Sequence, residues 1–152
     1  MKRLLLPTLF LLLSIACSSD DENATRSENE SYVLRLDLVS SIPGNPSSSD
    51  ATKTTGSAME FQEYYSLDQE GAFMRHRERD GKTIEETGMY ERGQWENKIP
   101  FIKFTYPDDS RLRGSCEVGN TEYLYLQENG LYKNEWGACD GTFLEYQVQE
   151  KK

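Results

Sequence analysis

The sequence has almost none of the residues that most catalytic sites require. Histidine occurs once, as His76, and neither a Gly-x-Ser-x-Gly segment nor a phosphate-binding glycine loop is present. Catalysis by an activated serine and nucleotide binding depend on such motifs. Carboxylates are plentiful, and a glycosidase needs only two of them, but Asp108-Asp109 after Pro107 is typical of a turn. We therefore expect no enzyme activity, no catalytic residues and no cofactor.

Basic residues are in the minority. The chain has 17 lysine and arginine residues against 26 aspartate and glutamate residues, and its formal net charge is −9. Such a charge repels the phosphates of nucleic acids and anionic lipid headgroups. The composition therefore indicates a protein without a nucleic-acid partner.

Long hydrophobic runs are also missing. The longest apolar stretch, residues 4–13, follows two basic residues. It is shorter than the roughly 20 apolar residues that a membrane-spanning helix needs. A basic start, a short apolar stretch and a small residue, Ala16, predict an export signal peptide over residues 1–16.

A cysteine, Cys17, directly follows this segment. The residues Leu13–Cys17 resemble the lipobox of bacterial lipoproteins, in which the cysteine is acylated and becomes the first residue of the mature chain. The resemblance implies lipidation at Cys17 by fatty acyl groups such as palmitate. Two or more acyl chains anchor a protein stably, so we expect the membrane as a partner through the N-terminal lipid.

Residues 17–31 contain almost no apolar side chains and carry several acids. Such a composition predicts a disordered acidic tether. Ser18–Glu22 resembles the acidic export tag of surface-exposed lipoproteins in certain Gram-negative bacteria. That resemblance implies an outer-membrane lipoprotein at the cell surface.

Two cysteines remain once Cys17 carries lipid, namely Cys116 and Cys139. In an oxidising compartment their simplest interpretation is a disulfide bond. The alternative, a metal site, would need more sulfur or imidazole ligands than His76 supplies. No spaced set of oxygen ligands for calcium is present either, so we expect a disulfide and no metal.

Residues 32–149 are predicted to form one all-β domain. Apolar residues alternate with polar ones, as in Leu34, Leu36 and Leu38, and this period of two is typical of half-buried strands. Turn residues recur at about the 8–12-residue spacing of β-sandwiches and barrels. The expected strands lie near residues 32–40, 60–67, 72–79, 82–91, 99–106, 111–118, 122–128, 131–136 and 143–149.

Two hairpins are specific enough to predict pairing. Asp80-Gly81 allows a two-residue loop, which sets Arg75 opposite Glu86, or a three-residue loop, which sets Arg75 opposite Glu85. Either register indicates cross-strand charge pairs on a solvent-facing side, formed by Arg75, Arg77, Arg79, Glu85 and Glu86. At Asn129-Gly130 a three-residue loop sets Leu126 opposite Tyr132 and keeps apolar residues on one face, so we prefer it.

Consecutive hairpins of this kind form a meander, and a meander of about eight strands removes its free edges by closing into a barrel. Four parts of the chain are similar to small lipocalin-like bacterial lipoproteins: Phe73, residues 87–90, residues 122–126 and the closing run of residues 138–146, which begins Ala-Cys-Asp-Gly. The resemblance implies an antiparallel meander of eight or nine strands that closes into a lipocalin-like β-barrel with a ligand cup.

Two functions from different classes follow from such a barrel, because an eight-stranded interior holds either its own side chains or one small ligand. The first is a carrier of a small apolar or amphiphilic ligand, lined by Leu34, Leu36, Phe61, Phe73, Tyr90, Phe104, Leu124 and Leu126. The alternative is an interaction or inhibitor protein whose barrel is filled. It would bind a protein partner through loops or through an aromatic surface of Tyr64, Tyr65, Tyr123, Tyr125 and Trp136.

A long polar link, residues 44–57, joins the first two predicted strands. Loops longer than about 12 residues are usually functional lids or disordered segments. The position resembles the first large loop of lipocalins, which folds over the barrel mouth. The serine and threonine content favours disorder, and both interpretations stay open.

Overall fold

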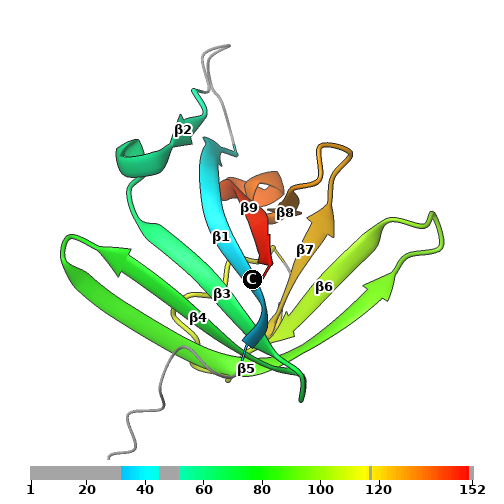
Figure 1. Ribbon diagram of the computed structural model, residues 1–152. Helices are drawn as coiled ribbons and strands as arrows, with labels where there is room; N and C mark the ends of the chain where they lie inside the picture. The colour runs from blue at the N-terminus through cyan, green and yellow to red at the C-terminus, as the bar shows by residue number, and fades with distance from the viewer. Residues whose placement is uncertain (1–31, 45–51, 117, 151–152) are drawn as a thin grey trace, which may run out of the picture.

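The computed structural model describes residues 32–44, 52–116 and 118–150. The predicted signal peptide, Cys17, the tether and residues 45–51 of the link over 44–57 therefore lie outside the described residues. The described residues form an antiparallel β-barrel (Figure 1). Its eight strands are β1 (Tyr32–Pro43), β3 (Gln62–Asp68), β4 (Ala72–Arg79), β5 (Lys82–Gln94), β6 (Pro100–Thr105), β7 (Thr121–Leu126), β8 (Tyr132–Asn134) and β9 (Thr142–Glu150).

The barrel closes because β1 pairs with β3 on one side and with β9 on the other. A short additional strand, β2 (Thr54–Thr55), pairs with the end of β1. Two 3₁₀ turns, η1 (Gly56–Ala58) and η2 (Trp136–Cys139), complete the elements. The predicted all-β meander that closes into a barrel is confirmed. No helix in the described part of the chain is long and apolar enough to cross a membrane.

The alternating pattern of the strands places one set of side chains inside the barrel. On β3 the buried residues are Glu63, Tyr65 and Leu67, and on β6 they are Ile102 and Phe104. The intervening residues face outward, as the period of two requires. The core therefore lies inside the barrel, and it contains charged residues as well as apolar ones.

Both predicted hairpins form. Asp80 and Gly81 have φ values of 53° and 70°, and they connect the paired residues Arg79 and Lys82. Positive φ at both central positions is the signature of the two-residue turn that suits a twisted hairpin. Arg75 consequently lies opposite Glu86 in the ladder. In the second hairpin Leu126 pairs with Tyr132, as predicted.

The predicted strand over 111–118 is wrong. Residues 107–116 belong to no strand, and the backbone N–H groups of Arg111 and Leu112 donate to the Glu86 carboxylate instead of to a neighbouring strand. A side chain, rather than a neighbouring strand, thus accepts the hydrogen bonds of these backbone N–H groups. We call this stretch, Pro107–Cys116, the cap segment.

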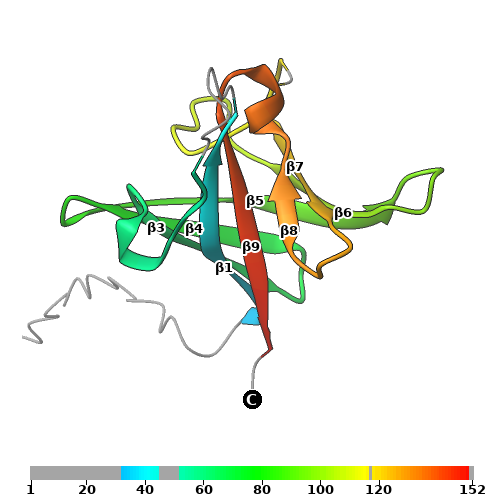
Figure 2. The ribbon, with the colours of Figure 1, turned by 90° about the horizontal axis from the view of Figure 1, so that it is seen from above.

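The antiparallel order gives the barrel two distinct ends. One end, here called the capped end, holds η1, the β4–β5 turn, the cap segment and η2. The other, the termini end, holds the start of β1, the end of β9 and the β3–β4, β5–β6 and β7–β8 turns. Figure 2 shows η2 and the C-terminus at opposite ends of the barrel.

Candidate functional site

The guanidinium group of Arg75 occupies the middle of the barrel. Its side chain is fully buried, and Nη2 donates to Oε1 of Glu63 at 2.8 Å while Nη1 donates to Oε2 of Glu122 at 2.8 Å. Both glutamate side chains are also fully buried. The prediction of a solvent-facing Arg75 is wrong. Arg75 lies two residues after Phe73, and both side chains are on the inner face of β4.

Two tyrosine hydroxyls hydrogen-bond to this ion pair. The Tyr106 hydroxyl accepts from Arg75 Nη1 at 2.8 Å and donates to Glu122 at 3.0 Å. The Tyr146 hydroxyl donates to Glu63 at 2.5 Å. Hydrogen bonds of this kind are what a buried charge needs to offset its lost hydration. We call Arg75, Glu63, Glu122, Tyr106 and Tyr146 the charge cluster.

The pKa values of the two carboxyl groups in the charge cluster are shifted in opposite directions. Burial alone would raise the pKa of Glu63, but Arg75 and Arg77 outweigh it and hold that pKa below its usual value. Burial raises the pKa of Glu122, although Arg75 and the Gly114 N–H oppose the rise. Burial would lower the pKa of Arg75, but Glu122 and Glu63 keep it well above its usual value, so the guanidinium stays charged.

Arg77 and Arg79 also have other partners than those predicted. Arg77 donates to Glu63 from Nε at 2.5 Å and lies over the Phe61 ring at 4.0 Å. Arg79 pairs with Glu60. Neither arginine pairs with Glu85 or Glu86 as expected, because the acidic partners come from β3 and the residues before it rather than from β5.

A different basic residue does pair across the β4–β5 hairpin on its outer side. Nδ1 of His76 lies 2.9 Å from Glu85 Oε1, in the predicted two-residue-loop register. The structure therefore has one of the two strand registers that the sequence left open, but the arginines have other partners than predicted.

The eight residues predicted to line a ligand cup differ in burial and in their position along the barrel axis. Four lie in the packed middle of the barrel, where the Phe104 ring is 4.9 Å from that of Phe73 and 4.5 Å from that of Tyr65. These four fully or almost fully buried residues are Leu36, Phe73, Phe104 and Leu124. The half-buried residues Leu34, Tyr90 and Leu126 lie toward the termini end, and Phe61 lies toward the capped end beside Arg77.

The cap segment enters the capped end and contacts the charge cluster. The Leu112 carbonyl accepts from Arg75 Nη1 at 2.6 Å, and the Gly114 N–H donates to Glu122 Oε2 at 3.1 Å. Leu112 itself is buried in the barrel. The segment therefore supplies part of the polar surroundings that the buried charges require.

Glu86 holds the cap segment from the barrel wall. Its carboxylate accepts hydrogen bonds from the Ser110 hydroxyl at 2.5 Å, from the Arg111 N–H at 2.6 Å and from the Leu112 N–H at 3.2 Å. Burial would raise the pKa of Glu86, but these donors lower it overall. Glu86 was predicted to form a surface ion pair, and nothing in the sequence around it indicates that it binds the backbone of residues 111 and 112.

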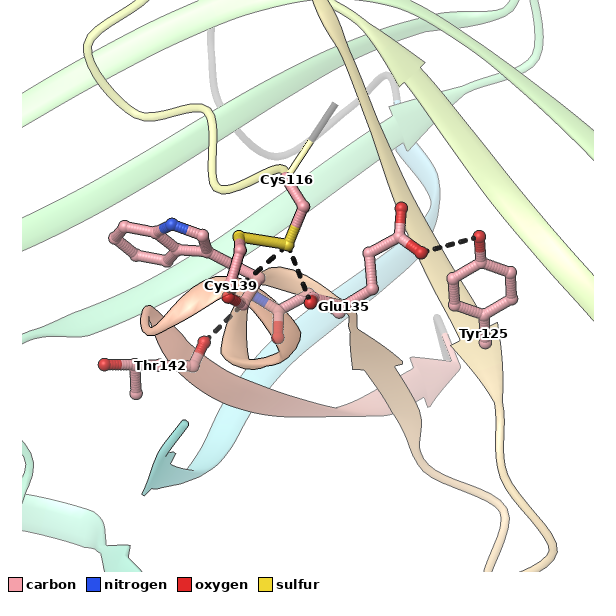
Figure 3. Close-up of a disulfide and its surroundings, with 7 residues drawn as sticks. Cys116, Tyr125, Glu135, Cys139 and Thr142 are labelled. Carbon is pink, nitrogen blue, oxygen red and sulfur yellow. Dashed lines mark hydrogen bonds between the residues drawn. A yellow bond between two sulfur atoms is a disulfide. The ribbon is translucent and has the colours of Figure 1, made fainter. Parts of the chain in front are cut away.

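A disulfide ends the cap segment. Cys116 and Cys139 lie with their sulfur atoms at bonding distance and their Cα atoms 5.7 Å apart, within the range that a disulfide requires. This is the pairing that the sequence predicted. Figure 3 shows the bond joining the cap segment to η2, with Glu135 beside it and the Tyr125 hydroxyl donating to the Glu135 carboxylate at 3.2 Å.

Four aromatic rings form a continuous row on the outside of the barrel, over β6 and β7 and the β5–β6 turn. We call Trp95, Phe101, Tyr123 and Tyr125 the aromatic face. Ring centroids are 5.2 Å apart between Trp95 and Phe101, 5.5 Å between Phe101 and Tyr123, and 6.1 Å between Tyr123 and Tyr125. Figures 1 and 2 show that the β5–β6 hairpin extends beyond the barrel wall.

The predicted aromatic surface agrees only in part with the aromatic face. Tyr123 and Tyr125 belong to it. The prediction that Tyr65 is a surface residue is wrong, because Tyr65 is fully buried in the core. Trp136 lies in η2, where it packs against Gly114 and Gly141. Tyr64 is on the outer side of β3, between the Arg35 guanidinium and the His76 ring.

Trp95 and Phe101 were not among the surface residues predicted from the sequence. Phe104 was predicted to line the interior, so the period of two already places Phe101, three residues earlier, on the outer side. Its ring covers Gly93, where an added Cβ would lie 2.4 Å from a ring carbon. Part of the aromatic face therefore compensates for the missing side chain on β5.

A shallow polar groove of about 300 Å³ lies elsewhere on the wall, where β1 leaves β3. Its lining residues are Arg35, Asp37, Leu38, Gln62, Glu63, Tyr64, His76 and Glu78. Both signs of charge are present in this lining. Among the residues that the structure describes, no group of three or more His, Cys, Asp or Glu side chains could hold a metal ion.

Compared with known proteins, the chain matches no family model, no curated protein and no solved structure. The similarity to lipocalin-like lipoproteins thus stays a prediction at the level of family, while the barrel itself is observed.

Proposed function

We propose that this protein is a lipid-anchored, non-catalytic interaction protein of the cell surface. Its barrel serves as a filled scaffold, and its aromatic face binds a protein partner. The observation that carries this proposal is the position of Arg75, which lies fully buried between two buried glutamates in the middle of the barrel.

The charge cluster argues against an apolar ligand in the centre. An eight-stranded barrel is only just wide enough for its own side chains or one small ligand. Here the centre already holds a guanidinium group, two carboxyl groups and two tyrosine hydroxyls within hydrogen-bonding distance of one another. A ligand there would separate a buried ion pair, which typically costs about 3–5 kcal/mol.

The aromatic face has the composition of a protein-binding surface. Tryptophan, tyrosine and phenylalanine are enriched at the centres of interfaces, and charged groups are found at the rim. Trp95 is 46% exposed and Ile99 is 39% exposed beside it. The ion pair of Lys103 with Glu91 lies on the same outer side, and Lys133 lies beyond Tyr125 in the ladder.

Photo-crosslinking tests the proposed interface on cells that produce the full chain. A photoreactive phenylalanine analogue at position 95 should give a discrete adduct with a protein. The same analogue at Thr83, an exposed position on β5 near the capped end, should not. Added wild-type protein should suppress the adduct, whereas a Trp95→Ala/Tyr123→Ala variant should not. Equal adducts at both positions, or equal suppression by both proteins, would contradict the proposal.

The lipid anchor has its own test. Mass spectrometry of the membrane fraction should find a processed chain that begins at an acylated Cys17, and Cys17→Ala should leave the precursor uncleaved. A soluble, unmodified chain that begins elsewhere would contradict the anchor while leaving the aromatic face untouched.

One observation favours a small apolar ligand as the second candidate. At the termini end the core is bordered by half-buried apolar residues, which include Leu34, Tyr90, Leu126, Tyr132 and Val148. A shallow ligand there would not disturb the charge cluster. Saturable binding of an apolar fluorescent dye that Leu126→Arg abolishes and Tyr123→Ala leaves unchanged would establish this carrier function.

A further inference from the structure

The cap segment is fastened at two points with different chemistry. Near its start the Glu86 carboxylate accepts hydrogen bonds from Ser110, Arg111 and Leu112. At its end the disulfide joins Cys116 to Cys139 in η2 (Figure 3). Between these points the Leu112 carbonyl and the Gly114 N–H contact the buried charge cluster.

Apart from the disulfide, the printed attachments of this segment are individual hydrogen bonds to Glu86, Arg75 and Glu122. Residues 107–116 pair with no strand, so a ladder of backbone hydrogen bonds does not support them. Gly114 packs closely against the indole of Trp136, where an added Cβ would lie 3.0 Å from a ring atom. Segments outside a strand ladder open locally at a lower free-energy cost than strands, and a covalent bond at one end opposes such opening.

The disulfide is accessible to reductants. Cys116 and Cys139 are both exposed, although the segment that they fasten contacts fully buried groups. Exposed disulfides are the labile class, whereas buried structural ones resist reduction.

We propose that the Cys116–Cys139 disulfide is a redox latch, whose reduction by a dithiol reductant releases the cap segment from the capped end and uncovers Arg75 and Glu122. A thiolate of the reductant attacks one sulfur and forms a mixed disulfide, and its second thiol resolves that bond. Two electrons and two protons then reside on Cys116 and Cys139 as thiols, and the reductant leaves as a disulfide. This device goes beyond the interaction function and does not depend on it.

The structure indicates which partner moves. η2 is held to the barrel without the disulfide. Its residue Gly137 packs against the Phe143 ring, and just after η2 the Gly44 N–H donates to the Gly141 carbonyl at 2.8 Å. The cap segment has the disulfide as its covalent attachment to this end. On reduction η2 therefore stays on the barrel and the cap segment separates from it.

Amide hydrogen exchange on the full chain tests the latch, comparing the protein with its disulfide intact and after reduction with dithiothreitol. The amides of Leu112 and Gly114 should exchange at least about tenfold faster after reduction, because local opening governs them. The Leu144 amide should change less than about twofold. A uniform rise across the barrel would show a general stabilising crosslink, and no rise in the cap segment would show no latch. Either result overturns the proposal.

Limited trypsin digestion gives a second, independent measurement. Reduction should accelerate cleavage after Arg111 and Arg113 in the cap segment. Cleavage after Lys98, in the exposed β5–β6 turn, should keep its rate and serves as the matched control. The variant Cys116→Ser/Cys139→Ser should be cleaved like the reduced protein without any reductant. Equal acceleration at Lys98 would contradict a local release.

Discussion

The charge cluster and the aromatic face invert the usual distribution of side chains in a small barrel. Inside, Arg75, Glu63 and Glu122 are fully buried and hydrogen-bonded. Outside, aromatic rings contact one another on a surface where Trp95 is nearly half exposed. Buried charge and exposed aromatic surface are the two features that hydrophobic burial alone does not explain.

The two regions differ in how their residues depend on one another. Each member of the charge cluster needs another, because a buried ion without its partner keeps the full cost of lost hydration. The rings of the aromatic face add small, separable contributions at a surface that water reaches. Substitutions inside should therefore act on folding, and substitutions outside should act on binding.

The largest effect is expected for Arg75→Met. The methionine leaves two buried carboxyl groups without their cation, and the loss of a partner from such a pair costs about 3–5 kcal/mol. Urea denaturation followed by circular dichroism measures the free energy of unfolding. Adding Glu63→Gln and Glu122→Gln to Arg75→Met should recover part of the loss. If the triple variant is no more stable than Arg75→Met, uncompensated charge is not the cause.

Acid titration should separate the two glutamates. The lowered pKa of Glu63 adds stability above its unfolded value near 4.5, and this stability is lost as the pH falls through the folded pKa. The raised pKa of Glu122 acts oppositely, so its contribution is fully present below the unfolded value and is lost as the pH rises through the folded pKa.

The free energy of unfolding, measured by denaturant titration at several pH values, should therefore rise as the pH falls toward 4.5 and decline below it. Glu122→Gln should remove the rise, and Glu63→Gln should reduce the decline. A decline that begins at neutral pH in both variants would show that other groups control the acid response.

A smaller effect is expected for Gly93→Ala under the aromatic face. The new Cβ would lie 2.4 Å from the Phe101 ring, so the ring must leave its position. Overpacking of this kind costs about 1–3 kcal/mol, and the exposed position of Phe101 favours the lower value. Thermal unfolding compares it with Thr83→Ala on the same strand, which should remain within about 0.5 kcal/mol of the wild type. Equal stability of the two variants would refute the proposed contact.

The smallest effect on stability is expected for Trp95→Ala. An exposed side chain away from special features changes the free energy of unfolding by about 0.5 kcal/mol or less. The thermal midpoint should therefore hardly change, while the crosslinked adduct obtained through position 123 should weaken. A marked fall in the midpoint would show that Trp95 supports the fold rather than binding.

Much of the barrel could be predicted from local patterns. Alternation in β1, the Asp80-Gly81 and Asn129-Gly130 turns and the even spacing of turn residues gave strands and registers that the structure contains. The expected strand over 111–118 failed because its backbone bonds to Glu86 and Glu122, which are remote in sequence. No local sequence pattern indicates that a distant side chain will accept the hydrogen bonds that a neighbouring strand would otherwise accept.

The interior shows the same limit. Arg75 has the inward parity of Phe73, yet its charge favoured a solvent-facing position until partners on β3 and β7 were known. Those partners meet only when the sheet closes. The alternation of β4 predicted that Phe73 and Arg75 share one face. It did not predict whether that face points into the barrel or to solvent.

The sequence by itself determined the all-β class, the meander, the register of the Asn129-Gly130 hairpin and the pairing of Cys116 with Cys139, because each depends on nearest neighbours or on simple counting. It left two registers open for the Asp80-Gly81 hairpin, and the structure has the two-residue loop. Tertiary structure alone decided that Arg75 is buried, that Glu86 holds the cap segment and that four rings from β6, β7 and the β5–β6 turn form one surface. The physical reason is closure of the barrel. It brings residues from distant strands within hydrogen-bonding distance, and the free energy of a buried charge depends on those partners rather than on its neighbours in sequence.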